Sequence, residues 1–423
     1  MITPAARILR ASREGERGFT LLELLVASVA GLFVVFAAFL LSRGATRVFA
    51  TEGRLATSQG NLRLGVDRLR SDIERAGFMS TANYRQDPNV VPVGSMGFTA
   101  RIQSLFYVQG TAATAAIDAP QSSAQGLYPD RLTIQGNFGT TDSYQVAAIE
   151  PSAGGGGVDI TLQVAVGSTA RLLSTGETGG SPASVMQATF AAGRLLRLRN
   201  DLGCSQYLLI QTATIAAGGR PVITTTAAPG VAQRTALSDK RCGLQGIGLG
   251  YEVNPVHTIE YGVYSLSSNA LFKWAYSDAS VGEANKYDLV RRELDQNGLP
   301  IAGTEEIISE YAVDLGFAFT VDTSVAQSAT VQTPPAIVPF DFGDANNATY
   351  GGDTVTGGSA MRPQRIRSVR YRLAVRTRDY DRSVSIDDGG IGLLRYQLGV
   401  GQFSRARTVM GEVSLINQQG VRW

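Results

Sequence analysis

Hydrophobic residues form one nearly continuous run close to the N-terminus of the chain. The run extends from Phe19 to Leu41 and contains a single carboxylate, Glu23, near its start. At about 1.5 Å of rise per residue, this run predicts roughly 34 Å of α-helix, which is enough to span a bilayer. We therefore expect a transmembrane helix over residues 19–41.

The apolar residues that follow this run recur at intervals of seven, four and three, which is the spacing of one face of an α-helix. They are Val48, Leu55, Leu62, Val66, Leu69 and Ile73. Charged residues, Asp72 among them, fall on the other faces, and Gly77 is the kind of residue that ends a helix. We expect an amphipathic helix over 42–78 whose apolar stripe packs on a globular region.

Beyond Asn83 the pattern changes to short β-rich segments that are separated by clusters of Gly, Ser, Thr and Pro. We expect strands at 131–135, 159–164, 194–198, 207–213, 222–226, 259–266, 271–276, 315–321, 369–375 and 409–415. The turn Ser267-Ser268-Asn269 should join the segments 259–266 and 271–276 as a hairpin. Exposed loops are expected at 110–126, 154–157 and 323–358. The pattern predicts an α+β fold, in which a long N-terminal helix packs on a large antiparallel β-rich globular region over 79–423.

Composition and charge exclude several classes of functional site. The chain has 38 Lys+Arg against 36 Asp+Glu, and this net charge of +2 excludes a polyanion binder that is driven by bulk charge. His257 is the only histidine and there are two cysteines, so a site with several His ligands or four thiolates is excluded. No P-loop or nucleophile elbow is present. We expect no catalytic activity, no cofactor and no bound metal.

The segment before the apolar run is a basic leader that ends in a small residue. Its arginines are Arg7, Arg10, Arg13 and Arg17. A secretory signal is cut after its apolar stretch, whereas Gly18 lies before it, so cleavage at Gly18 would leave the helix on the mature protein. Glu23 inside the apolar run is unfavourable in a membrane unless it meets a cation.

The segment Arg17-Gly18-Phe19-Thr20-Leu21-Leu22-Glu23 resembles the type III signal of type IV pilins and pseudopilins. The resemblance implies that a prepilin peptidase removes residues 1–18 by cutting between Gly18 and Phe19, and that it N-methylates Phe19. It also implies that Glu23 neutralises the terminal amine of a neighbouring subunit and thereby sets the axial register of a filament.

The length of the chain and its segment 72–78 resemble the large minor pilins of the PilW type. This implies a pilin-like fold and a role in type IV pilus assembly and priming. The partners would be other minor pilins, the major pilin and an adhesin at the pilus tip. The precursor would cross the bacterial inner membrane once, with its basic leader in the cytoplasm, before joining the extracellular pilus near its tip. Two alternatives stay open, namely a J-type pseudopilin of type II secretion and a competence-type DNA-uptake minor pilin.

Export of the chain would allow two further features, a disulfide and a basic binding surface, each formed by its own set of residues. Cys204 and Cys242 would form a disulfide in an oxidising compartment. A second set would share one strand face and could form a basic surface for DNA or an acidic partner. It consists of Arg370, Arg372, Arg376 and Arg378. We favour a solvated strand face that is balanced by Asp379 and Asp381, and we do not expect nucleic acid as a partner.

Acidic and amide residues gather within the expected loop at 323–358. They are Asp341, Asp344, Asn346, Asn347 and Asp353. Such oxygen ligands at short spacing could hold Ca²⁺, but their spacing does not match an EF-hand. A polar turn is the favoured interpretation.

Overall fold

The structure is a computed structural model of the chain. It describes residues 19–90, 101–111, 127–152, 157–165, 167–174, 181–200, 203–226, 251–277, 286–324, 334–354, 361–378, 395–399, 402–421 and 423. The chain divides into two compact units, Met1–Ala56 and Thr57–Trp423. We name them the N-terminal unit and the large unit.

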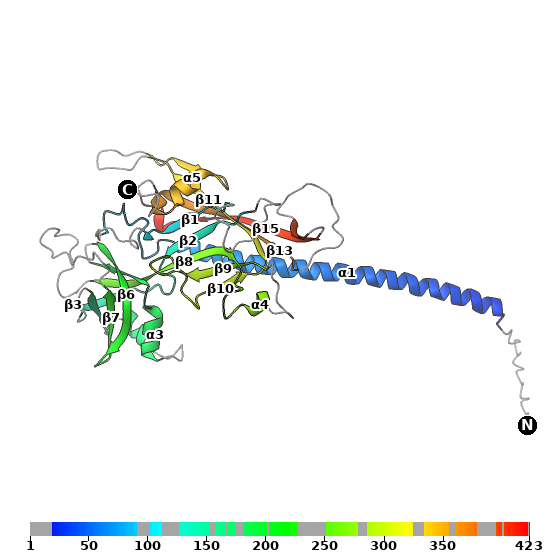
Figure 1. Ribbon diagram of the computed structural model, residues 1–423, viewed down its shortest axis with the longest axis horizontal. Coiled ribbons are helices and arrows are strands. Elements are labelled where there is room, and N and C mark those ends of the chain that lie inside the picture. Colours follow the sequence, from blue (N-terminus) through cyan, green and yellow to red (C-terminus); the bar gives the residue numbers. More distant parts are fainter. Residues whose placement is uncertain are drawn as a thin grey trace, which may run out of the picture. The chain divides into compact units, whose positions relative to one another are not determined.

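Helix α1 (Leu21–Glu74) begins in the N-terminal unit and ends in the large unit (Figure 1). In the N-terminal unit its apolar side chains are exposed; Leu32, for example, is 72% exposed. The helix is long and apolar enough to cross a membrane. The prediction of an apolar N-terminal helix of membrane-spanning length is therefore confirmed.

In the large unit, the last turns of α1 pack their apolar stripe into a core. Leu62, Leu69 and Ile73 are buried, and Val66 packs against the same core while partly exposed. The helix ends at Glu74, four residues before the predicted boundary, and the chain turns through Gly77, whose φ is +75°. The stripe and the stop at Gly77 are thus confirmed over this part of the helix.

The larger of two sheets contains ten strands within the described residues. They are β1 (Leu105–Val108), β2 (Arg131–Gly136), β3 (Tyr144–Pro151), β4 (Val158–Leu162), β5 (Leu195–Arg199), β6 (Ser205–Ala216), β7 (Arg220–Thr226), β8 (Glu252–Tyr264), β9 (Asp288–Glu293) and β10 (Glu306–Ser309). Its main order is β1-β2-β8-β3-β4-β7-β6-β5, with β9 and β10 branching from β8. All of its ladders are antiparallel, as the sequence predicts.

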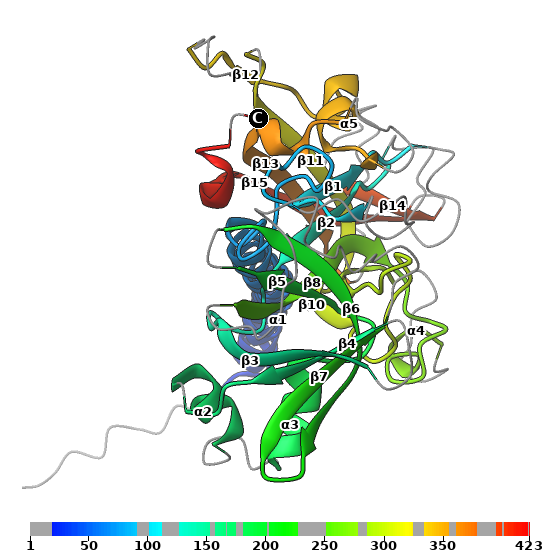
Figure 2. The same cartoon turned by 90° about the vertical axis from the view of Figure 1, so that its left-hand side faces the viewer.

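Part of this sheet closes on itself. Strand β5 pairs with β8 as well as with β6, so β8, β3, β4, β7, β6 and β5 form a closed ring of paired strands. Apolar side chains fill the ring, among them Ile160, Leu208 and Val253. Helices α2 (Gly167–Leu173) and α3 (Pro182–Thr189) lie beside it, and Met186 of α3 is fully buried in the same cluster (Figure 2).

The second sheet has the order β12-β11-β13-β15-β14. Its strands are β11 (Ala312–Asp322), β12 (Ile337–Pro339), β13 (Ile366–Arg376), β14 (Arg395–Gly399) and β15 (Gln402–Ser414). One continuous core unites the end of α1 with both sheets, because Ile73, Tyr261 and Leu373 belong to the same buried cluster. Burial of this core is the main favourable contribution to the stability of the large unit.

The expected hairpin at 259–276 is wrong in its second half. Strand β8 covers the first segment, but Trp274–Ser277 forms the short helix α4, and β8 pairs with β9 instead. Asn269 explains the change, because its backbone oxygen accepts from Lys273 N at 2.8 Å and its side chain accepts from Leu271 N at 2.9 Å. These bonds turn the chain into a helical conformation before it can extend.

The expected loop at 323–358 is wrong in part. Strand β12 and helix α5 (Ala345–Gly351) lie within it. Asp344 begins α5 as its N-cap, with its side chain accepting from Asn346 N. The other expected strands are present, with ends that differ by up to three residues, except that β8 and β15 each begin seven residues earlier than predicted. The expected loops at 110–126 and 154–157 lie almost entirely outside the described residues.

Candidate functional site

The start of α1 holds the residues that resemble a processing signal. Gly18 lies outside the described residues, and Phe19 and Thr20 directly precede the helix. Phe19 is 85% exposed. Glu23 Oε2 accepts from Thr20 N at 3.0 Å and from Thr20 Oγ1 at 3.1 Å, while Glu23 N donates to Thr20 Oγ1 at 3.2 Å. The two residues therefore form a reciprocal capping box.

Glu23 therefore caps the helix within the single chain, a role that was not predicted. The signal for it is present, since Thr20 and Glu23 have the Thr-x-x-Glu spacing of a capping box directly before an apolar run. The carboxylate is exposed and lies at the positive end of the helix dipole, which favours an anion there.

Cys204 lies directly before β6 and is 5% exposed. It is disulfide-bonded. Cys242 is the only other cysteine in the sequence and lies outside the described residues. The pairing of these two cysteines therefore stays a prediction. Cys204 N donates to Asn200 Oδ1 at 2.8 Å, which fixes the backbone next to the sulfur.

The arginines of β13 do not form a free basic surface. Arg372 Nε donates to Asp314 Oδ2 at 2.7 Å, and Arg370 lies 3.6 Å from a carboxylate oxygen of Asp341. Both guanidinium groups also lie over the ring of Phe342, at 5.0 and 5.7 Å from its centre. The balancing acids differ from Asp379 and Asp381, which lie outside the described residues.

Arg376 departs further from the expectation of a solvated face. It is 3% exposed and lies 4.9 Å from the ring centre of Tyr311. Its Nη1 donates to the backbone oxygens of Thr377 and Arg378. Arg378 itself is exposed. Arg376 is buried because the rings of Tyr311 and Tyr396, whose centres lie 4.9 and 6.0 Å from its guanidinium carbon, pack against its side chain.

The acidic and amide cluster at 341–353 is used by the fold. Asn347 is fully buried, where its Oδ1 accepts from Phe319 N at 2.9 Å and its Nδ2 donates to Asp341 O at 2.8 Å. Asp344 caps α5. Within the described part of the chain, no group of three or more His, Cys, Asp or Glu side chains is placed to hold a metal ion.

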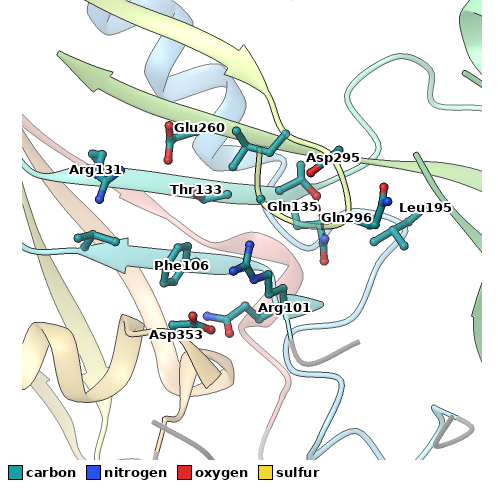
Figure 3. A pocket seen from close by; sticks show the side chains of 15 residues that line it. Arg101, Phe106, Arg131, Thr133, Gln135, Leu195, Glu260, Asp295, Gln296 and Asp353 are labelled. Atoms are coloured by element: carbon teal, nitrogen blue, oxygen red, sulfur yellow. Dashed lines mark hydrogen bonds between the residues drawn. The ribbon is translucent and has the colours of Figure 1, made fainter. Parts of the chain in front are cut away.

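A cavity of about 210 Å³ lies on the face of β1, β2 and β8 that points away from the core. Leu132 and Ile134 of β2 point into the core, whereas the alternate residues Arg131, Thr133 and Gln135 line the cavity. Figure 3 shows these three side chains along β2, with Phe106 on β1 and Glu260 on β8. The remaining lining residues are Arg101, Gln103, Val108, Leu195, Thr258, Leu294, Asp295, Gln296, Gly298 and Asp353.

The polar side chains of this cavity are held in defined positions. Glu260 accepts from Arg292 Nη2 at 2.6 Å and from Tyr264 OH at 2.7 Å. Gln135 is 3% exposed, and its Nε2 donates to Thr258 Oγ1 at 2.9 Å, while its Oε1 has no hydrogen-bond partner. A buried acceptor without a donor is unfavourable by about 1–3 kcal/mol. One buried acceptor of a cavity-lining residue is therefore unsatisfied.

His257, the only histidine, lies on β8 and is 7% exposed. Its Nδ1 accepts from Phe138 N at 3.4 Å, and the two rings are in edge-to-face contact. Burial lowers the pKa of His257 to about 4. The imidazole is therefore neutral at physiological pH and acts as a packed acceptor.

Comparisons of the chain with protein-family models, with curated proteins and with solved structures found no match. Function is therefore inferred from the chain's own residues. Two regions have features of a functional site, namely the start of α1 and the cavity on the outer face of the sheet.

Proposed function

We propose that this chain is a minor pilin of the PilW type that takes part in type IV pilus assembly. The observation that carries the proposal is the order of the N-terminal residues: a basic leader, then Gly18 and Phe19, then an apolar helix with Glu23 in its first turn. Cleavage before the helix, unlike cleavage after it, leaves a mature subunit that can insert the helix into a filament.

The proposed partners follow from this route. A prepilin peptidase would cut after Gly18 and methylate Phe19 while α1 lies in the inner membrane. The mature chain would then join other minor pilins and the major pilin in a complex that primes the pilus and sits near its tip, next to an adhesin. The exposed apolar side chains of α1 in the N-terminal unit support this proposal, because such a surface needs lipid or other helices to cover it.

Glu23 would change partners during assembly. In the single chain its carboxylate accepts hydrogen bonds from Thr20. In an apolar filament core a charge needs a cation, and the terminal amine of a neighbouring subunit is the proposed one. Because the carboxylate is exposed in the single chain, it is accessible for this exchange.

Of the two alternatives, a type II secretion pseudopilin would share the same N-terminal residues. It is distinguished by where the processed chain is found, which is why the test below uses isolated pili. The DNA-uptake alternative needs an exposed basic strand. Arg372 is paired with Asp314 and Arg376 is buried, so the described residues give this alternative little support.

The test is mass spectrometry of pili that are sheared from cells of the native host. The expected result is a chain that begins at methylated Phe19 in the pilus fraction. A Gly18→Trp variant should instead leave a full-length precursor in the membrane, because the peptidase needs a small residue at the cut. Gly31→Ala is the matched control, since a Cβ at Gly31 meets nothing within 4 Å. Normal processing of the Gly18→Trp variant would refute the proposal, and a processed chain that is absent from pili would favour the pseudopilin.

A further inference from the structure

The cavity on β1, β2 and β8 is small and open to solvent-sized molecules. Its volume of about 210 Å³ is below the roughly 300–1,000 Å³ of sites for drug-sized ligands. The cavity can therefore hold a ligand of one ring with its substituents. Most of its walls come from three neighbouring strands and from the turn after β9.

The lining mixes hydrogen-bond donors and acceptors at close range. Arg131 supplies guanidinium donors, as do the groups of Arg101 other than Nη1, which donates to Asn297 O. The carboxylates of Asp295 and Asp353 supply acceptors. Thr133 and Thr258 can do both. An apolar ligand would remove these groups from water without replacing their hydrogen bonds, which is unfavourable. A ligand with several hydroxyl groups meets both needs, because each hydroxyl donates and accepts.

The charges of the cavity nearly cancel. Arg101 and Arg131 stand against Asp295 and Asp353, and the fifth charged side chain, Glu260, is already neutralised by Arg292 at 2.6 Å. A ligand with a net charge would meet groups of its own sign on one side. The lining therefore favours a ligand without net charge.

Phe106 adds one apolar wall among these polar groups. It is half-buried on β1, and Figure 3 shows its ring between Arg101 and Arg131. A partly exposed aromatic ring beside fixed polar groups suits a ring that has an apolar face and a polar edge.

We propose that this cavity binds a single neutral saccharide ring. The apolar face of the ring packs on Phe106, and its hydroxyl groups bond to Arg101, Arg131 and the carboxylates of Asp295 and Asp353. The proposal does not depend on the chain being a pilin. For one small ring in an open site, the affinity should be on the order of millimolar.

The experiment is saturation-transfer NMR on the full chain in a detergent whose head group contains no sugar. The probes are glucose, galactose, mannose and N-acetylglucosamine, with glycine as a zwitterion and acetate as an anion. We expect saturation transfer to the ring protons of at least one sugar. Loss of a charged hydrogen-bond donor should weaken binding about tenfold, so Arg101→Met and Arg131→Met should each nearly abolish the signal.

Arg220→Met is the matched control, because Arg220 is an exposed arginine on β7 of the same sheet and lies outside the cavity. It should leave the signal unchanged. The absence of transfer to every sugar would overturn the proposal. Transfer to glycine or acetate alone would overturn it as well, and so would a sugar signal that persists in both cavity variants. Two cavity variants are used so that misfolding of one leaves a valid test.

Discussion

Arg291 on β9 donates a hydrogen bond of 2.7 Å from its Nε to Oδ2 of Asp72, in the last turn of α1. Tyr261 OH on β8 donates to the same oxygen at 2.7 Å. Asp72 is 3% exposed, so its charge is compensated inside the protein. These contacts join the helix to two strands of the larger sheet, at a residue that the helical pattern alone assigns to a polar face.

Replacing Asp72 by Asn should destabilise the large unit strongly. The change leaves the guanidinium of Arg291, whose side chain is only 15% exposed, without its main counter-charge. Breaking such a pair by removing one partner costs about 3–5 kcal/mol. Urea unfolding of the detergent-solubilised chain measures the effect. Glu74→Gln is the control, because the exposed Arg70–Glu74 pair contributes no more than about 0.5 kcal/mol. Equal losses in the two variants would contradict the assigned role of Asp72.

Gly65 and Gly60 should respond in opposite ways to larger side chains. A Cβ at Gly65 would lie 3.0 Å from Ser309 Cβ on β10, whereas a Cβ at Gly60 meets nothing within 4 Å. We expect Gly65→Val to destabilise by about 1–3 kcal/mol through overpacking. We expect Gly60→Ala to stabilise by about 0.5–1 kcal/mol, because alanine favours the helix. Unfolding midpoints report both, and a stable Gly65→Val protein would show that α1 does not pack closely on β10.

His257 should stay neutral until strongly acidic pH. Burial lowers its pKa to about 4 in the folded protein, compared with 6.5 for the ordinary side chain. The folded state therefore binds fewer protons than the unfolded state between these two pH values. Its contribution to stability is complete above pH 6.5 and is lost as the pH falls through about 4. Since one pKa unit is equivalent to about 1.4 kcal/mol, the loss should approach about 3 kcal/mol.

The measurement uses ¹³C labelling of histidine Cε1, which gives one resonance because the chain has one histidine. The midpoint should lie near pH 4 in the folded chain and near 6.5 in urea. A folded-state midpoint above 6 would show that the imidazole is solvated.

The disulfide of Cys204 should contribute substantially to stability. If its partner is Cys242, the cross-link should raise the free energy of unfolding by about 4 kcal/mol in the chain-entropy model. A Cys204→Ser/Cys242→Ser double variant should therefore unfold at lower urea concentration, and reduction of the wild type should reproduce the shift. Peptide mapping without reductant should recover the two cysteines as one cross-linked pair. Recovery of Cys242 as a free thiol would contradict the pairing.

The sequence predicted well those elements that depend on local patterns. The stripe through Leu62, Leu69 and Ile73 packs into the core, and nine of the ten expected strands are present, although β1, β3, β9, β10, β12 and β14 were not predicted. Helical and strand patterns repeat every 3.6 and 2 residues, so a short stretch of sequence is enough to reveal them. Helix α4 was missed because Asn269 side-chain hydrogen bonds, rather than hydrophobic alternation, direct the chain there.

Features that depend on distant pairings could not be predicted. The cavity exists because β1, β2 and β8 lie side by side, and Leu195 reaches it through pairing of β5 with β8. No local pattern specifies these registers. Arg376 is a second example. Its place on the same strand face as Arg370 and Arg372 was predicted, but its burial against Tyr311 was not. At the start of α1, the Thr20–Glu23 spacing could have been identified as a cap from the sequence alone.

The closed ring of strands has a consequence for how the large unit can meet its neighbours. An unpaired strand edge offers a row of backbone groups to which another chain can add a strand. Among the described residues, each strand of the ring is paired on both sides over part of its length, whereas β1, β10, β12 and β14 end their sheets. In the described part of the chain, these four strands are therefore the full-length edges at which a strand could add. Where the ring strands are paired on both sides, another molecule can be recognised only through side chains, so these stretches are protected from non-specific strand pairing.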